Sequence, residues 1–268
     1  MMHRKPILPL RILPLISLFP LLAPLTIFSL LTGWSFRSMA GEQIVLIAQT
    51  FQPPDRGAPP SSSSGSPRRG GESSISEHNI IPLVPRDQIT NVLWGQTLSE
   101  TPTFFLYVPA QMTHAIKFYL VDDAEGELIY DETVTPPVAG GIMAIALPRN
   151  PGKTLQIDKL YNWYFEVQTS SQPSVTTQKP IVGGFVRRIV PSPELSSKLQ
   201  TATNDSDRSQ IYADYGIWYD LLATAATLRT TNPDHWELLL NSVGLGAIVE
   251  APLITATDSA INNPGANR

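Results

Sequence analysis

Apolar residues occupy every second position through much of the middle of the chain, which is typical of half-buried β-strands. The clearest run places Tyr161, Trp163, Phe165 and Val167 on one face, with Asn162, Tyr164 and Glu166 between them. Runs of the same character occupy residues 104–108, 116–120, 128–130, 143–147 and 181–190. Short strands without a helical pattern between them predict an antiparallel, immunoglobulin-like β-sandwich over residues 80–190.

Three short segments of this region have a more specific expected geometry. Residues 122–126 have the composition of a hairpin turn, and Gly126 can adopt a positive φ there. Residues 183–184 are both glycine inside a predicted strand, which indicates a bulge or a close approach of another backbone. Residues 187–188 are both arginine, and we expect one of the two to pair with the acidic turn.

The apolar period changes to 3.6 residues after Val190, which predicts a helical region over residues 191–254. Capping residues, prolines and glycines mark where the helices begin or end. These positions are Ser192 with Pro193 and Glu194, Asn204 or Asp205, Gly216, Asn232 with Pro233, and Gly244. The pattern predicts four helices.

Residues 216–233 resemble the second half of a tetratricopeptide unit. Tyr212 stands at the expected aromatic position, Gly216 precedes a helix and Pro233 follows it. A single unit lacks the neighbouring repeats that form a peptide-binding groove, so we expect a helical hairpin that packs on the sandwich. The predicted fold class is α+β, an immunoglobulin-like antiparallel sandwich followed by a small tetratricopeptide-like helical hairpin region.

Residues 1–48 predict an export signal, because basic residues precede an apolar run over residues 12–31. Small side chains suit cleavage after Ala40, and a second possible cleavage site follows Ala48. The apolar run is closer in length to a membrane span than to an ordinary signal, so an uncleaved N-terminal anchor is the alternative. Both interpretations place the rest of the chain outside the cytosol, in the periplasm or secreted.

Two segments lack any apolar period. Residues 49–79 are rich in proline, serine and glycine, which predicts a disordered linker between the N-terminus and the sandwich. Residues 255–268 predict a disordered tail.

Composition narrows the possible partners. The 268 residues include 25 prolines and no cysteine, which excludes disulfides, thiol catalysis and thiolate metal sites. After residue 48, fifteen Lys and Arg stand against 22 Asp and Glu, a net charge of −7. An acidic chain repels phosphate backbones, so we exclude nucleic acid as a partner. We expect membrane contact only through an uncleaved N-terminus.

The sequence offers few residues for chemistry. No pair of its four histidines has metal-ligand spacing, and no Gly-x-Ser-x-Gly motif occurs, so we predict no catalytic residue, metal or cofactor. Asp122, Asp123 and Glu125 are the exception, since paired carboxylates can hydrolyse glycosides. A hairpin turn explains the same three residues without catalysis.

Aromatic residues of the helical region are the candidate partner-binding residues. Trp218, Tyr219 and Trp236 are expected near the seam between the strands and the helices. Trp218 and Trp236 fall on the apolar helix faces, which indicates core positions, whereas we expect Tyr219 to be exposed.

Several short segments are specific as a set and together cover roughly residues 49–254. They are Tyr-Ala-Asp-Tyr-Gly-Ile-Trp-Tyr-Asp over residues 212–220, and residues 51–59, 83–85, 97–105, 107–109, 191–195 and 242–245. With these segments the chain resembles the cyanobacterial domain-of-unknown-function 928 family. The resemblance implies an exported protein without an established activity, and it implies no functional residues.

These observations favour a non-catalytic interaction or accessory module of the cell envelope, with an envelope protein or a glycan as its partner. One alternative is a carbohydrate-active hydrolase that uses the acidic hairpin. The other is a membrane-tethered structural component of the envelope.

Overall fold

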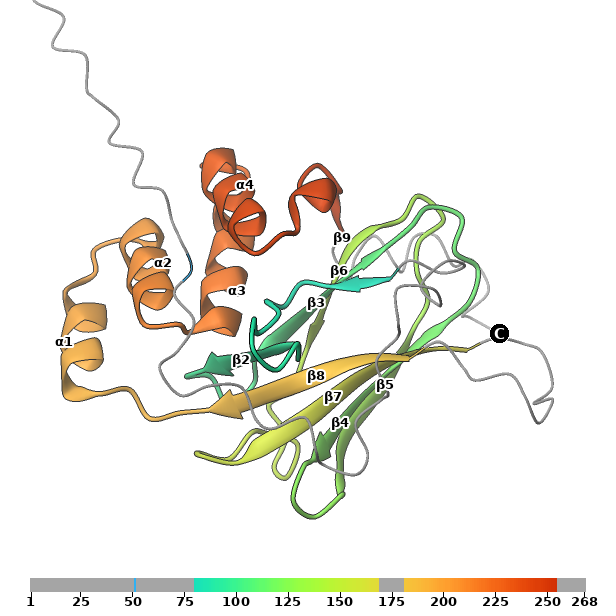
Figure 1. Cartoon of the computed structure of the whole chain (residues 1–268), viewed down its shortest axis with the longest axis horizontal. Helices are drawn as coiled ribbons and strands as arrows, with labels where there is room; N and C mark the ends of the chain where they lie inside the picture. Colours follow the sequence, from blue (N-terminus) through green and yellow to red (C-terminus); the bar gives the residue numbers. More distant parts are fainter. Residues whose placement is uncertain (1–50, 52–79, 169–180, 255–268) are drawn as a thin grey trace, which may run out of the picture. The chain divides into compact units, whose positions relative to one another are not determined.

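The computed structural model describes residue 51, residues 80–168 and residues 181–254, all within one compact unit, Leu46–Arg268. The fold is α+β (Figure 1). Its strands are β1 (Ile81–Pro82), β2 (Trp94–Thr97), β3 (Thr103–Val108), β4 (Ile116–Asp122), β5 (Leu128–Val134), β6 (Gly141–Ala146), β7 (Leu160–Val167), β8 (Ile181–Arg188) and β9 (Leu253–Ile254). Its helices are α1 (Pro193–Thr201), α2 (Asp205–Asp214), α3 (Trp218–Leu228), α4 (Pro233–Ser242) and the short 3-10 helix η1 (Gly246–Ile248).

The strands form two sheets. One sheet has the order β1-β3-β6-β9 and the other has the order β2-β8-β7-β4-β5. Most neighbours are antiparallel, as predicted, but β2 pairs with β8 and β9 pairs with β6 in parallel. The predicted antiparallel arrangement is therefore confirmed for most strand pairs and wrong for these two. Parallel neighbours need long connections, and the chain supplies them through the strands between β2 and β8 and through the helices before β9.

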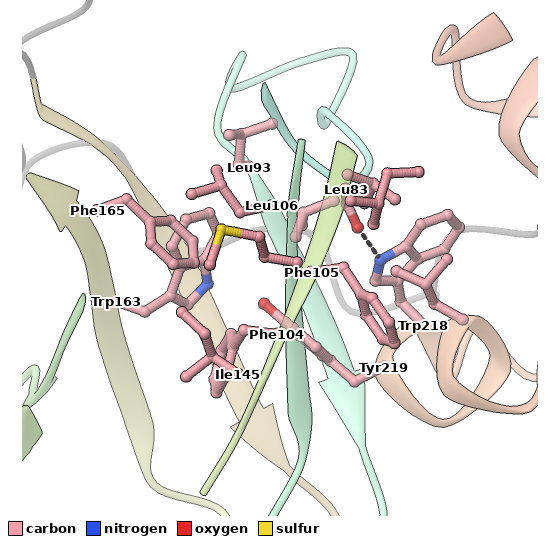
Figure 2. Packing of buried hydrophobic residues seen from close by; sticks show 14 of the residues in the cluster. Leu83, Leu93, Phe104, Phe105, Leu106, Ile145, Trp163, Phe165, Trp218 and Tyr219 are labelled. Carbon is pink, nitrogen blue, oxygen red and sulfur yellow. Dashed lines mark hydrogen bonds between the residues drawn. The ribbon is translucent and has the colours of Figure 1, made fainter. Parts of the chain in front are cut away.

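The two sheets meet through aromatic side chains. The ring of Phe104 on β3 lies 4.9 Å from that of Phe118 on β4 and 6.2 Å from that of Trp163 on β7, measured between centroids. Figure 2 shows Phe104, Trp163 and Phe165 converging in this layer. On β7 the predicted inward residues Tyr161, Trp163, Phe165 and Val167 are all buried, but Asn162 and Glu166 between them are buried as well. Alternating burial is confirmed on β4, where buried and half-buried residues alternate from Ile116 to Asp122.

The helix boundaries confirm the capping signals. The Ser192 side chain accepts a hydrogen bond from the Leu195 N–H, and Pro193 is the first residue of α1. Asn204 caps α2 in the same way through the Asp207 N–H. Gly216 has a φ of +69° between α2 and α3, a conformation that favours glycine.

The helical region and the two sheets, which we call the sandwich below, share one continuous apolar core. Helix α3 contacts β2 and β3, and after α4 and η1 the chain returns to pair β9 with β6. Figure 1 shows the helices near β2, and the strand order places β5 at the opposite edge of that sheet. The segment that follows the helices thus ends in β9, an edge strand of the sheet β1-β3-β6-β9.

Residue 51 is the one described residue of the expected linker. Phe51 is buried, and its ring meets that of Trp218 edge to face at a centroid distance of 4.9 Å. The rest of that range, the expected export signal and the expected tail lie outside the described residues. Among the residues that are described, no helix is long and apolar enough to cross a membrane.

Two glycines allow close approach, as the pair at 183–184 led us to expect. A Cβ on Gly184 would collide with the Leu93 carbonyl oxygen and lie 2.5 Å from the Trp163 ring. A Cβ on Gly95 would lie 2.9 Å from the Trp218 Cβ and 3.1 Å from the Tyr219 ring. Both positions therefore need a residue without a side chain.

We expect Gly184→Ala to lower the free energy of unfolding by about 3 kcal/mol and Gly95→Ala by about 1–2 kcal/mol. The difference arises because the carbonyl that blocks position 184 belongs to the backbone and cannot rotate away. Urea unfolding followed by tryptophan fluorescence measures both values. Equal stability of Gly184→Ala and the wild-type chain would contradict the close approach.

Candidate functional site

Helix α3 begins where the helices meet the sandwich, and its first residues include two of the predicted partner-binding residues. Trp218 is fully buried, and its indole Nε1 donates a hydrogen bond to the Leu83 carbonyl oxygen at 2.9 Å. Figure 2 shows this bond beside the aromatic cluster. The indole thus satisfies a buried carbonyl just after β1 while its ring packs against Phe51.

The expectation that Tyr219 is exposed is wrong, because only 2% of this residue is accessible to solvent. Its ring contacts that of Phe104 at 5.2 Å, and its hydroxyl donates to the Phe185 carbonyl oxygen on β8 at 3.2 Å. Burial raises the pKa of the Tyr219 hydroxyl. Gly95 lets α3 lie directly against β2, so that α3 is covered on two adjacent faces. The apolar period of the sequence does not reveal a contact that depends on a glycine in a distant strand.

Asp220, which sequence reasoning missed, completes the first turn of α3. Its carboxylate accepts hydrogen bonds from the Thr97 hydroxyl at 2.7 Å and from the Leu98 N–H at 3.0 Å. Burial raises the pKa of Asp220, while these donors act in the opposite direction. We call Trp218, Tyr219 and Asp220 the α3 anchor, because three successive residues bond to three different segments of the sandwich.

Trp236, the third predicted partner-binding residue, is also buried. Its Nε1 donates to the Val249 carbonyl oxygen at 3.2 Å, and the Arg229 guanidinium lies 5.2 Å from its ring. Arg229 donates to the carbonyl oxygens of Val249 and Ala251 at 2.8 and 2.7 Å. These contacts hold the segment that leads into β9, so Trp236 has a structural position like the other two aromatic residues.

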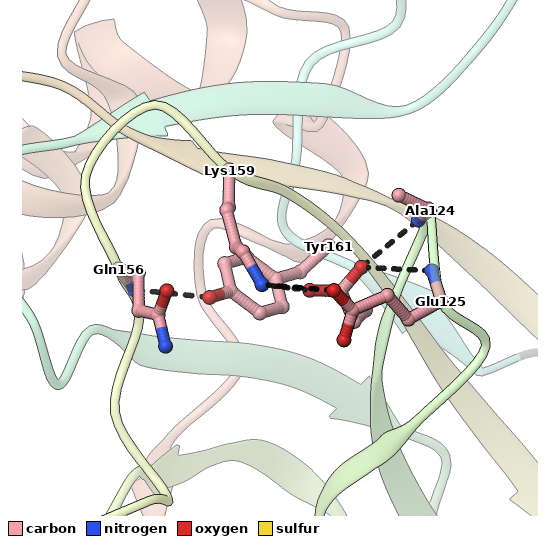
Figure 3. Close-up of polar contacts among 6 residues, drawn as sticks. Ala124, Glu125, Gln156, Lys159 and Tyr161 are labelled. Carbon is pink, nitrogen blue, oxygen red and sulfur yellow. Dashed lines mark hydrogen bonds and ion pairs between the residues drawn. The ribbon is translucent and has the colours of Figure 1, made fainter.

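The acidic hairpin is a tight turn whose central carboxylate is occupied. The Asp122 carboxylate accepts hydrogen bonds from the N–H groups of Ala124 at 2.9 Å and Glu125 at 3.1 Å, and from Lys159 Nζ at 3.0 Å. Figure 3 shows Lys159 reaching toward the turn that contains Ala124 and Glu125. Burial alone would raise the pKa of Asp122, but Lys159 and the two N–H groups outweigh it and lower the pKa. A carboxylate with a lowered pKa is a poor general acid.

The other acidic members of the hairpin have contacts of their own. Asp123 accepts a hydrogen bond from the Asn162 side chain, and Glu125 is 61% exposed and lies 3.7 Å from Lys159. The expectation that an arginine of residues 187–188 pairs with this turn is wrong. Lys159 takes that place, while Arg188 lies 3.8 Å from Glu100 and donates to the Leu155 carbonyl oxygen.

A buried polar pair joins two helices. Ser209 on α2 and His235 on α4 are both buried, and their Oγ and Nε2 atoms lie 2.5 Å apart. Burial lowers the pKa of His235, because the charged imidazolium is poorly solvated there. In residues 80–168 and 181–254, no three His, Asp or Glu side chains gather as metal ligands.

We expect Asp220→Ala to lower the free energy of unfolding by about 2–4 kcal/mol, because the Thr97 hydroxyl and the Leu98 N–H would both lose their buried acceptor. Asp220→Asn retains an acceptor oxygen of the same size and should cost about 1 kcal/mol or less. Chemical unfolding of both variants at pH 7 checks the ranking. Equal loss in the two variants would contradict an acceptor role.

We expect His235 to make the free energy of unfolding fall as the pH is lowered through about 6.5. The unfolded chain binds the proton near its ordinary pKa, whereas the folded chain binds it only at lower pH, so acid favours unfolding. The measurement is unfolding between pH 7.5 and 5 for the wild-type chain and for His235→Gln. Contributions of Asp122 and Asp220 cancel in the difference, which should shrink with falling pH.

A protein-family model matches most of the chain. The family model described as a Domain of Unknown Function, DUF928, matches residues 64–253, a range that includes every described strand and helix except the last residue of β9. No curated protein matches the chain. The matched range is well over half of the 268 residues, and it agrees with the resemblance seen in the sequence. The chain belongs to the DUF928 family.

Proposed function

We propose that this chain is an exported, non-catalytic interaction module of the cell envelope. The observation that carries the proposal is the contrast between buried polar groups that are engaged within the fold and, among the described residues, one long strand at the edge of a sheet. Polar groups suited to chemistry, namely Asp122, Asp220 and His235, are engaged in holding the fold together. The edge strand β5, by contrast, spans Leu128–Val134 and has exposed side chains.

We further propose that the sandwich is immunoglobulin-like. The sheet order β1-β3-β6 corresponds to strands A-B-E of that fold, and β8-β7-β4-β5 corresponds to G-F-C-C′. Strand β9 lies beside β6, where strand D would stand. Many cell-surface domains use this architecture, which supports a binding role. The hairpin of α2 and α3 is proposed as a single tetratricopeptide-like unit, supported by Gly216 and Pro233 at helix boundaries.

Export is proposed on the N-terminal sequence. Basic residues followed by the apolar run at residues 12–31 favour passage across a membrane, and small residues before Gly41 and Gln49 offer cleavage sites. Absence of cysteine is compatible with this route. The alternative is a membrane-tethered structural component, in which the N-terminal segment is not cleaved and Met1 is retained.

The hydrolase interpretation receives no support from the hairpin geometry. A glycosidase needs one carboxyl group that holds its proton and a second that is free to attack or to activate water. Asp122 instead has a lowered pKa and accepts three hydrogen bonds inside the turn. We therefore place the proposal with binding.

The proposal predicts cross-linking from a discrete surface in the native envelope. A photoreactive residue is placed in turn at Thr133 on β5, at Val138 and at Glu237 on α4, three exposed positions on different elements. We expect one position to give a single abundant adduct in the envelope fraction, while the other two serve as matched controls.

The same cells show whether the chain is exported. N-terminal sequencing of the envelope-bound chain should begin at Gly41 or Gln49, whereas an intact Met1 would indicate the tethered structural component. Recovery of the full chain in the cytosolic fraction, or identical weak adducts from all three positions, would contradict the proposed function.

A further inference from the structure

The two sheets have four edges, and three of them are short or covered among the described residues. Strands β1 and β9 have two residues each, and β2 has four residues that lie under α3. Strand β5 has seven residues, from Leu128 to Val134, and ends its sheet. Leu128 is 51% exposed, and Asp131 and Thr133 are exposed as well. A long uncovered edge can pair with another chain.

Backbone bonds at both ends of β4 show which groups of β5 point outward. The Ala115 carbonyl accepts from the Gln168 N–H beyond β7, and the Asp123 N–H donates to the Leu160 carbonyl of β7. Residues 115 and 123 are odd-numbered and bond toward β7. Asp122 is even-numbered, and its N–H donates to the Glu127 carbonyl on the β5 side instead. Because successive residues of a strand turn their backbone groups to opposite sides, the even-numbered residues of β4 bond to β5.

The register then assigns the residues of β5. Glu132 and Val134 are the partners of Phe118 and Ile116, so their backbone groups turn toward β4. Asp131 and Thr133 alternate with them, so their N–H and C=O groups face away from the sheet. Two residues spaced by two positions on an exposed edge supply the hydrogen-bonding pattern that an added strand needs.

The surroundings of this edge are acidic. Six carboxylates belong to the hairpin and to β5: Asp122, Asp123, Glu125, Glu127, Asp131 and Glu132. Three lysines lie among them: Lys117 is 2.9 Å from Asp131, Lys159 is 3.0 Å from Asp122, and Lys153 Nζ is 5.6 Å from the centre of the Tyr130 ring. Burial, followed by the carboxylates of Glu132 and Asp131, raises the pKa of Tyr130 to about 12. The net local charge is therefore negative, and it favours an added strand that carries basic side chains.

We propose that β5 receives an extended, lysine- or arginine-bearing segment of a partner protein as an additional strand. This inference rests on the proposed function of the chain as an interaction module. Main-chain bonds to Asp131 and Thr133 supply the affinity, and the carboxylates on both faces of the edge select basic side chains. A second copy of the chain is disfavoured, because pairing β5 with β5 would bring the same acidic side chains together.

The test uses the full-length chain in detergent and a fluorescent eight-residue peptide in which lysine alternates with valine. A second peptide has the same side chains but carries N-methyl groups on alternate backbone amides, and a third has glutamate in place of lysine. We expect anisotropy to report binding of the first peptide and at least tenfold weaker binding of the other two. Amide hydrogen exchange should slow at Asp131 and Thr133 when the first peptide is added.

The matched variants change one outward donor at a time. Thr133→Pro removes an N–H that faces away from the sheet, so the fold should persist while peptide binding falls at least tenfold. Thr133→Val retains the N–H and should bind as the wild-type chain does. If Thr133→Pro fails to fold by circular dichroism, Asp131→Lys replaces it, and we expect that variant to prefer the glutamate peptide.

Several results would overturn the inference. If the N-methylated peptide binds as tightly as the unmodified lysine peptide, the interaction depends on charge and not on strand addition. If Thr133→Pro binds the lysine peptide as tightly as the wild-type chain does, the peptide binds at another site. A concentration-dependent dimer that is lost in Thr133→Pro would make a second copy the occupant. An adduct from Glu237 or Val138 without peptide binding at β5 would reject this edge while the interaction module survives.

Discussion

The α3 anchor is the contact on which the arrangement of helices and strands depends. Trp218, Tyr219 and Asp220 are consecutive, yet they bond to Leu83, to Phe185 and to the end of β2. Each of these bonds satisfies a polar group in or beside the core, where an unpaired group is costly. A shift of α3 along the sandwich would break all three at once. Gly95 makes the contact possible, because any side chain there would push the helix away from β2.

The need to satisfy buried polar groups also explains why the candidate site residues of the sequence stabilise the fold. Asp122 holds a hairpin, His235 bonds to Ser209, and Trp236 with Arg229 holds the segment before β9. Because these groups already have partners within the fold, a binding partner would have to contact sheet edges and exposed side chains. Binding through the β5 edge is consistent with that division, since strand addition uses backbone groups rather than a reactive centre.

Much of the fold could be predicted because its signals are local. Strands β3, β4 and β7 were predicted from alternating apolar residues, and the starts of α1 and α4 from a cap or a proline. Strands β1, β2 and β9 were missed, because two to four residues are too few to show a period. Their pairing depends on segments far away in the chain, as the parallel contact between β9 and β6 illustrates.

The candidate site shows the limit of such reasoning. A helical period correctly assigned Trp218 and Trp236 to the core, but it left Tyr219 on the outside and gave no weight to Asp220 or Thr97. Alternation, caps and turn residues act between neighbours, so the order of amino acids alone determined which segments become strands, helices and turns. Hydrogen bonds that span 122 to 135 residues leave no such trace. Only the tertiary structure decided which helix face meets the sandwich and which strand edge stays open, because both follow from the mutual placement of segments distant in the chain.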